Sequence, residues 1–280
     1  VTFALTILQR RLASSARAIR KSLERRFERL SELYKKGQLL QDREYIDEEA
    51  LEDYEEKERW NKEEDLLEKL TSADTLEELK NEIGILENLV KLAKEVEKKE
   101  TETKFTELKK VIDTENIDLQ QNKLLIFTES KDTLEYLAEK LGKWGYSVAT
   151  IHGGMNLDAR IRAEHDFKST AQIMISTEAG GEGINLQFCW LMVNYDIPWN
   201  PNRLEQRMGR VHRYGQTHEV HIYNLVAIDT REGVILNRLF EKLDQIRVHL
   251  GSDRVFDVIG ELIVGKSLKD LIVDAISNRR

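Results

Sequence analysis

The chain has 280 residues, 40% of them hydrophobic and 34% charged, with a net charge of -8, a composition typical of a soluble globular protein of one or two domains. The one cysteine, Cys189, excludes a disulfide framework and a cysteine-rich metal site, and it favours a reducing, cytoplasmic location. No run approaches the 18 consecutive apolar residues that a membrane-spanning helix needs, and the histidine spacing predicts no metal site.

The charge is unevenly distributed along the chain. Residues 1–40 carry 10 basic and 3 acidic side chains, a net charge of +7, whereas residues 41–120 carry 13 basic and 27 acidic side chains, a net charge of -14. The remaining residues are almost neutral. Because a phosphate backbone responds to local charge, the overall acidity does not exclude nucleic-acid binding.

Residues 1–118 are predicted to form a helical segment, because they lack proline and are rich in Leu, Glu, Lys and Arg. An apolar stripe with helical spacing comprises Leu12, Ala16, Ile19, Leu23, Phe27, Leu30 and Tyr34. A second stripe alternates in steps of three and four, which predicts a coiled-coil-like hairpin packed on the first helix: Leu76, Leu79, Ile83, Leu86, Val90 and Ala93.

Two interpretations of this helical segment stay open. It is either a purely structural bundle, or a protrusion that contacts DNA through a basic face made of Arg10, Arg11, Arg17, Arg20, Lys21, Arg25, Arg26 and Arg29. The acidic part, residues 41–110, is also a candidate contact for a protein partner.

The sequence pattern changes near residue 119, and residues 119–230 predict an α/β fold. Short apolar runs such as "KLLIFT", "AQIMIST" and "WLMVNYD" alternate with amphipathic stretches, which indicates a parallel sheet flanked by helices. Functional residues of such sheets follow the carboxyl ends of the strands. The loops of interest therefore follow Thr128, His152, Thr177 and Asp196.

Those loops carry hydroxyls and glycines. Gly153 and Gly154 free the backbone to approach a ligand, and "STEAGGEGINL" precedes a predicted helix. Plain turn formation would explain the same glycines. The stretch "DIPWNPNRLEQRMGRVHRYGQ" holds both prolines of the chain and predicts a turn followed by a helix. Arg210 and Arg213 share one side of that helix, either as a phosphate clamp or as a solvated basic face.

The order of these motifs resembles the second RecA-like lobe of superfamily 2 helicases. "AGGEGINL" followed by "WNPNRLEQRMGRVHRYGQ" is similar to the SWI/SNF-like DNA translocases of the bacterial and archaeal branch, and residues 1–35 resemble the helical segment that joins their two lobes. The resemblance implies a RecA-like parallel sheet without a phosphate loop of its own. Glu182 departs from the pattern, since many relatives carry a neutral or basic residue there.

The resemblance also implies site residues and ligands. Arg213 would be an arginine finger with Arg210 beside it, and Gln206 would couple the nucleotide to the lobe interface. Gly183, Asn185 and Gly209 would lie near the nucleotide. The nucleic-acid backbone would be contacted by Thr128, Ser130, Gly153, Gly154 and Thr177. ATP and Mg²⁺ would be held mainly by a first lobe of the same polypeptide, and the track would be double-stranded DNA.

"GELIVGKS", residues 260–267, matches a phosphate-loop pattern but is better explained by helices. Only 13 residues follow Ser267, and the bulky interior "ELIV" resists the backbone angles of a phosphate cradle. Residues 231–280 are therefore predicted to be C-terminal helices that pack on the lobe. We expect no ATPase activity from the chain alone. Three alternatives stay open: an NTPase that uses Lys266, a non-enzymatic interaction module, and an RNA helicase lobe.

Overall fold

The chain folds into two compact units, each of which is described by itself. The computed structural model describes residues 2–39, 54–69, 71, 73–99, 103–117, 122–178, 186–198, 201–212, 216–227 and 233–234. The first unit comprises Val1–Thr103 and Ser130–Tyr136, and the second comprises Lys104–Glu129 and Leu137–Arg280. The predicted C-terminal helices of residues 231–280, with "GELIVGKS", lie outside the described residues apart from 233–234.

The first unit is helical. Its helices are α1 (Thr2–Ser14), α2 (Ala16–Lys35), α4 (Glu56–Lys69) and α5 (Leu76–Lys99), together with the start of α7 (Lys131–Lys143). Ser15 separates α1 from α2 and caps the second helix, because its Oγ accepts a hydrogen bond from the amide of Ala18 at 3.1 Å. Across the described ranges, no helix is long and apolar enough to cross a membrane.

Helices α2 and α5 share an apolar core, as the spacing of the second stripe predicted. From α2 this core takes Leu23, Leu30 and Leu33, and from α5 it takes Leu79, Leu86, Val90 and Ala93. Ile83 packs against the same cluster, whereas Leu76 is 39% exposed at the helix start. The packing of the acidic segment's long helix on the N-terminal helix is therefore observed.

The basic face of α1 and α2 is covered by carboxylates. Arg17 and Arg20 both bind Glu97 of α5, while Arg26 binds Glu82 at 2.5 Å. The other pairs are Arg10 and Arg11 with Glu63, Lys21 and Arg25 with Asp132, and Arg29 with Glu32. The structural interpretation of this segment is thereby favoured, because DNA phosphates would have to displace these carboxylates.

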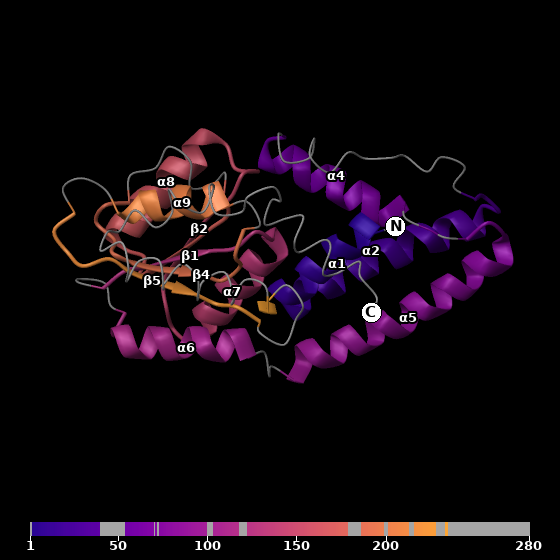
Figure 1. Ribbon diagram of the computed structural model, residues 1–280, viewed down its shortest axis with the longest axis horizontal. Helices are drawn as coiled ribbons and strands as arrows, with labels where there is room; N and C mark the ends of the chain where they lie inside the picture. Colours follow the sequence, from indigo (N-terminus) through magenta and orange to yellow (C-terminus); the bar gives the residue numbers. More distant parts are fainter. Residues whose placement is uncertain are drawn as a thin grey trace. The chain divides into compact units, whose positions relative to one another are not determined.

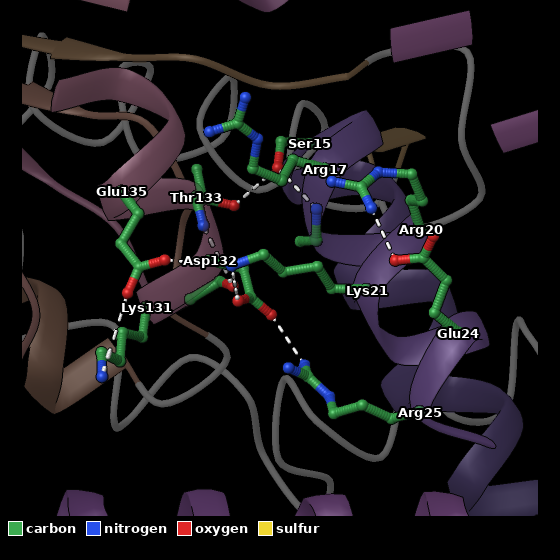
Figure 2. Close-up of polar contacts among 12 residues, drawn as sticks. Ser15, Arg17, Arg20, Lys21, Glu24, Arg25, Lys131, Asp132, Thr133 and Glu135 are labelled. Atoms are coloured by element: carbon green, nitrogen blue, oxygen red, sulfur yellow. Dashed lines mark hydrogen bonds and ion pairs between the residues drawn. The ribbon is translucent and has the colours of Figure 1, made fainter. Parts of the chain in front are cut away.

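Asp132, in the first turn of α7, pairs with two of these cations, Lys21 and Arg25. Its Oδ2 lies 2.7 Å from a guanidinium nitrogen of Arg25, and its Oδ1 lies 3.0 Å from Nζ of Lys21 (Figure 2). Next to it, the Thr133 hydroxyl is 2.8 Å from Ser15 Oγ. Burial alone would raise the pKa of Asp132, but Arg25 and Lys21 outweigh it and hold the pKa below its usual value.

The second unit is a five-stranded parallel sheet with helices on both sides. Its strands are β1 (Leu124–Phe127), β2 (Val148–Ile151), β3 (Ile173–Ser176), β4 (Leu191–Asn194) and β5 (His221–Asn224). Its helices are α6 (Thr103–Glu115), α8 (Leu157–Ser169), α9 (Pro201–Val211) and the later part of α7. Figure 1 shows α8 and α9 on one side of the sheet and α6 on the other.

The strands are ordered β2-β3-β1-β4-β5, and all neighbours run parallel. Successive residues of a strand face opposite sides, so Leu125 and Phe127 meet α8 and α9 in one core, where Phe167 and Val211 are also buried. All five strands lie in the predicted apolar runs, β5 in "VHIYNLVA". The predicted parallel sheet flanked by helices is confirmed. Strands β1 to β3 end one residue before Thr128, His152 and Thr177, and β4 ends two residues before Asp196.

We predict that Asp132→Asn lowers the free energy of unfolding by about 1–2 kcal/mol at pH 7, because Arg25 and Lys21 each lose a poorly exposed carboxylate and keep only Glu64 and Glu135 among the described residues. Since the folded pKa of Asp132 is depressed, its contribution is present above the unfolded value near 3.9 and is lost as the pH falls through the folded pKa. Urea denaturation of both proteins at pH 7 and pH 3 measures this.

The matched control is Glu135→Gln, which removes a 45% exposed partner of the same Lys21 and should change stability by less than about 0.5 kcal/mol. Equal unfolding free energies for Asp132→Asn and the unmodified chain at pH 7 would contradict the prediction.

Candidate functional site

The carboxyl ends of the strands are aligned and bring the predicted loop residues to one edge of the sheet. Phe127 is in register with Ser176 and with Asn194. The pairing continues one residue further, because the amide of Thr128 donates to Ser176 O at 3.0 Å and the amide of Tyr195 donates to Phe127 O at 2.8 Å. Thr128, Thr177 and Tyr195 therefore start their loops at the same level.

The glycine turn after β2 is built around two side chains. The amide of Gly154 donates to Nδ1 of His152 at 3.1 Å, and Arg160 donates to the carbonyls of Gly153 (3.1 Å) and Met155 (3.2 Å). A Cβ at Gly154 would lie 3.2 Å from the His152 ring, so a larger residue there would require the ring to move by a few tenths of an ångström. Gly154 itself is exposed, which leaves this turn accessible to a ligand.

Thr128 and Thr177, both predicted to contact a nucleic-acid backbone, are fully buried. The hydroxyl of Thr128 donates to Oδ2 of Asp196 at 2.5 Å, and the same carboxylate is paired with Lys104 at 2.9 Å. A threonine has one hydroxyl proton, and phosphate oxygens only accept. Thr128 can therefore donate to a phosphate only by releasing Asp196.

Ser130, the third predicted hydroxyl contact, belongs to the first unit. Its side chain is buried, and its Oγ accepts a hydrogen bond from a guanidinium nitrogen of Arg11 at 3.1 Å. The same oxygen lies 3.4 Å from the amide of Thr133, in the first turn of α7. In this structure the Ser130 hydroxyl thus helps to attach α1 to the start of α7.

Helix α9 carries the residues of the predicted arginine motif. Pro201 is its first residue, where the missing N–H is not needed for helical hydrogen bonding. Gln206 is exposed and Arg210 is partly buried, and their spacing of four places them on one side of the helix. No described atom lies within 4 Å of a Cβ built at Gly209. The predicted site residues Arg213, Gly183 and Asn185 lie outside the described residues.

Arg207, which the sequence analysis did not select, is the central residue of this edge. Its side chain is 2% exposed and donates to the carbonyl of Asp196 at 2.7 Å and to Oδ1 of Asn194 at 3.3 Å. Its Nε lies 3.3 Å from Oε1 of Glu178, and Glu129 is 4.0 Å from Nη2. Charges balance in the surrounding cluster, which comprises Lys104, Arg203 and Arg207 with Glu129, Glu178 and Asp196.

A signal for Arg207 exists in the sequence. The buried positions of α9 are Leu204, Arg207 and Val211, which recur in steps of three and four. An arginine in the middle of an otherwise apolar helical stripe predicts a buried cation, and a buried cation predicts carboxylates nearby.

We predict that Thr128→Val lowers the free energy of unfolding by about 1.5–3 kcal/mol, because a hydrogen bond to the buried Asp196 carboxylate is lost. The nucleic-acid affinity of the full-length protein should stay unchanged at fixed salt. Chemical denaturation and fluorescence anisotropy measure the two quantities.

Thr128→Ser is the control, since it keeps the hydroxyl and loses only the methyl group. The prediction would be contradicted if Thr128→Val bound nucleic acid more weakly at unchanged stability while Thr128→Ser bound it normally. That result would show that the Thr128 hydroxyl contacts the nucleic acid.

Known proteins resemble the part of the chain that contains this edge. Residues 103–215 match the helicase conserved C-terminal domain. A stretch of 122 residues is 49% identical to the uncharacterized ATP-dependent helicase YqhH of Bacillus subtilis (strain 168), covering 44% of this chain and 22% of that protein. A stretch of 134 residues is 38% identical to the ATP-dependent DNA helicase DDM1 of Arabidopsis thaliana, covering 46% of this chain and 18% of that protein.

Among solved structures, the C-terminal part of the Fun30 ATPase domain is similar to this chain, with a TM-score of 0.46 and 26% identity, covering 63% of this chain and 53% of that one. The matches span about a fifth of the length of the two curated relatives. Residues 103–215 thus resemble the helicase conserved C-terminal domain, and the two curated proteins that they resemble are named ATP-dependent helicases.

Proposed function

We propose that this chain is the second lobe of an ATP-dependent helicase or DNA translocase, and that it supplies arginine fingers to an ATP site completed by a first RecA-like lobe of the same polypeptide. The observation that carries the proposal is α9, which is held against the carboxyl ends of β1, β3 and β4 and displays Gln206 and Arg210 on one side. The family of residues 103–215 supports the same conclusion.

The residues present fit a triphosphate contributed from another lobe. Arg210 is partly buried in α9. Arg213, which lies outside the described residues, would be the second arginine of the motif, and the guanidinium fork suits phosphate oxygens. In phosphoryl transfer, ATP and Mg²⁺ supply the reacting group, and arginines stabilise the charge that develops on its oxygens. Gly183, Asn185 and Gly209 would border the nucleotide. Without a phosphate loop of its own, the lobe is expected to be inactive as an ATPase alone.

Nucleic-acid contact is assigned first to the glycine turn of Gly153 and Gly154. The turn stands at the carboxyl edge of the sheet, and Gly154 is exposed there. Thr128, Thr177 and Ser130 would contribute only with a rearrangement of their present bonds. Double-stranded DNA is the proposed track, which agrees with the name of the relative DDM1. An RNA helicase lobe is the alternative. A cytoplasmic location is proposed from the single cysteine, Cys189, a buried thiol.

In the full-length protein, Arg210→Ala and Arg213→Ala are each expected to reduce nucleic-acid-stimulated ATP turnover by about 10³-fold or more, because the charge of the transition state loses a cation. Circular dichroism should show unchanged folding. Steady-state phosphate release gives the rate, and titration calorimetry of this chain alone with Mg·ATP should show no binding tighter than millimolar.

The control is Glu205→Gln, which changes an exposed residue of the same helix and should leave turnover unaltered. Near-normal turnover in Arg213→Ala would refute the arginine-finger proposal. Micromolar ATP binding by this chain alone, lost in Lys266→Ala, would favour the self-contained NTPase instead.

A second candidate function is protein contact through α5, within the acidic segment. One side of α5 carries a broad band of apolar side chains. Helix α2 packs against only part of this band. The uncovered part is a stripe in steps of four, three and four, with exposed fractions of 62%, 41%, 57% and 44%: Ile85, Leu89, Leu92 and Val96. This spacing is typical of a seam that receives an amphipathic helix.

A photo-activated cross-linker at Leu92 in the full-length protein should yield one discrete product, because the stripe would seat a defined helix. Ile85→Gln with Val96→Gln should abolish it, since the stripe loses apolar contact area. Gel mobility and mass spectrometry of the product identify the partner helix.

The matched position is Lys91, which is exposed beside the stripe and should give no discrete product. Identical product patterns from residues 91 and 92 would contradict a helix seat on this stripe.

A further inference from the structure

We propose that Arg207 is a positioning residue that fixes α9, and with it Arg210, over the carboxyl ends of three strands. The inference rests on the proposed function, because it assigns to Arg207 the orientation of the arginines that would act on ATP. Arg207 itself is buried and does not contact the nucleotide in this proposal.

The geometry of Arg207 is that of a junction. Three regions of the chain meet its guanidinium: the end of β4 through Asn194 and Asp196, the residue two positions after β3 through Glu178, and the residue two positions after β1 through Glu129. Nη1 donates both hydrogen bonds, to the carbonyl of Asp196 and to Oδ1 of Asn194, whereas Nε and Nη2 face Glu178 and Glu129 as buried ion pairs without an aligned hydrogen bond among the described residues. Rotation or sliding of α9 would therefore disturb two hydrogen bonds and two ion pairs together.

Stability alone does not account for an arginine at this position. Leu204 and Val211 flank it on the buried side of α9, so a Met or Leu at 207 would complete an apolar stripe. Replacing a buried ion pair with apolar side chains of similar volume is often neutral or stabilising, because charges are costly to remove from water. The buried cation is instead suited to fix one orientation out of several that an apolar contact would tolerate.

Glu178 links this junction to the predicted nucleotide segment. It is the last described residue before the segment that holds Gly183 and Asn185, and Arg203 binds it as well, at 3.4 Å. The ion pairs of Glu178 with Arg203 and Arg207 therefore connect α9 to the residue that precedes this segment. A misplacement of a reacting group by about 1 Å can reduce a rate by about 10²-fold, so the junction would set the rate without touching ATP.

The test uses the full-length protein with three variants: Arg207→Lys, which keeps the charge and loses the fork, Arg207→Met, and Glu178→Gln. For both Arg207 variants we expect kcat for ATP to fall by about 10²-fold while the KM for ATP and the nucleic-acid affinity stay within about twofold. Arg207→Met should be at least as stable as the unmodified protein in thermal melts. Combining Arg207→Met with Glu178→Gln should reduce kcat no further than Arg207→Met alone.

A merely structural role makes a different prediction, in which kcat falls only in proportion to the folded fraction. If Arg207→Lys or Glu178→Gln folds and has a normal kcat, the positioning role is overturned. If Arg207→Met does not fold, these two milder variants decide the question. Arg210→Ala is measured in parallel. If it retains turnover, the proposed function fails; if it loses turnover while the Arg207 variants do not, only the positioning inference fails.

Discussion

Pairing of arginines with carboxylates from distant parts of the chain is the interaction on which both units depend. In the first unit, Arg25 joins α2 to Asp132 of α7 across 107 positions of sequence. In the second unit, Arg207 joins α9 to residues that follow β1, β3 and β4. A desolvated cation is costly unless a counter-charge is held in place, so each of these arginines specifies a particular arrangement of the elements around it.

This pairing changes what the charge distribution means. A net charge of +7 in residues 1–40 has the appearance of a nucleic-acid surface, but the following 80 residues carry the opposite charge in excess. In the folded unit, Glu63, Glu82 and Glu97 bind the basic face of α1 and α2 directly. The basic excess of residues 1–40 is thus neutralised within the chain by part of the larger acidic excess that follows it. Contact with nucleic acid is therefore better sought at the exposed glycine turn after β2, where backbone geometry rather than net charge makes the site.

The sequence predicted the sheet and the loops well, because a buried parallel strand must be apolar and its carboxyl end must be followed by a loop. Thr128, His152 and Thr177 were placed correctly on that basis. The partners of these residues were not predictable in the same way. Neither the bond of Thr128 to Asp196 nor the convergence on Arg207 leaves a local pattern, since each joins residues far apart in the chain. Only the interruption of the apolar stripe of α9 marked Arg207 as buried.

The two arginines of α9 illustrate why one helix can both anchor and act. Arg207 and Arg210 are three residues apart and are neighbours on the helix surface, the first buried and the second partly buried. In the proposed function, the lobe reaches its nucleotide only when a second lobe approaches. An arginine whose backbone is already fixed then needs no reorganisation during the reaction, and reorganisation would lower the rate. Burying Arg207 among the strand ends supplies that fixation, while the partial exposure of Arg210 leaves it accessible. In this arrangement, the buried charge pairs of Arg207 fix the helix that carries Arg210 at the boundary with solvent.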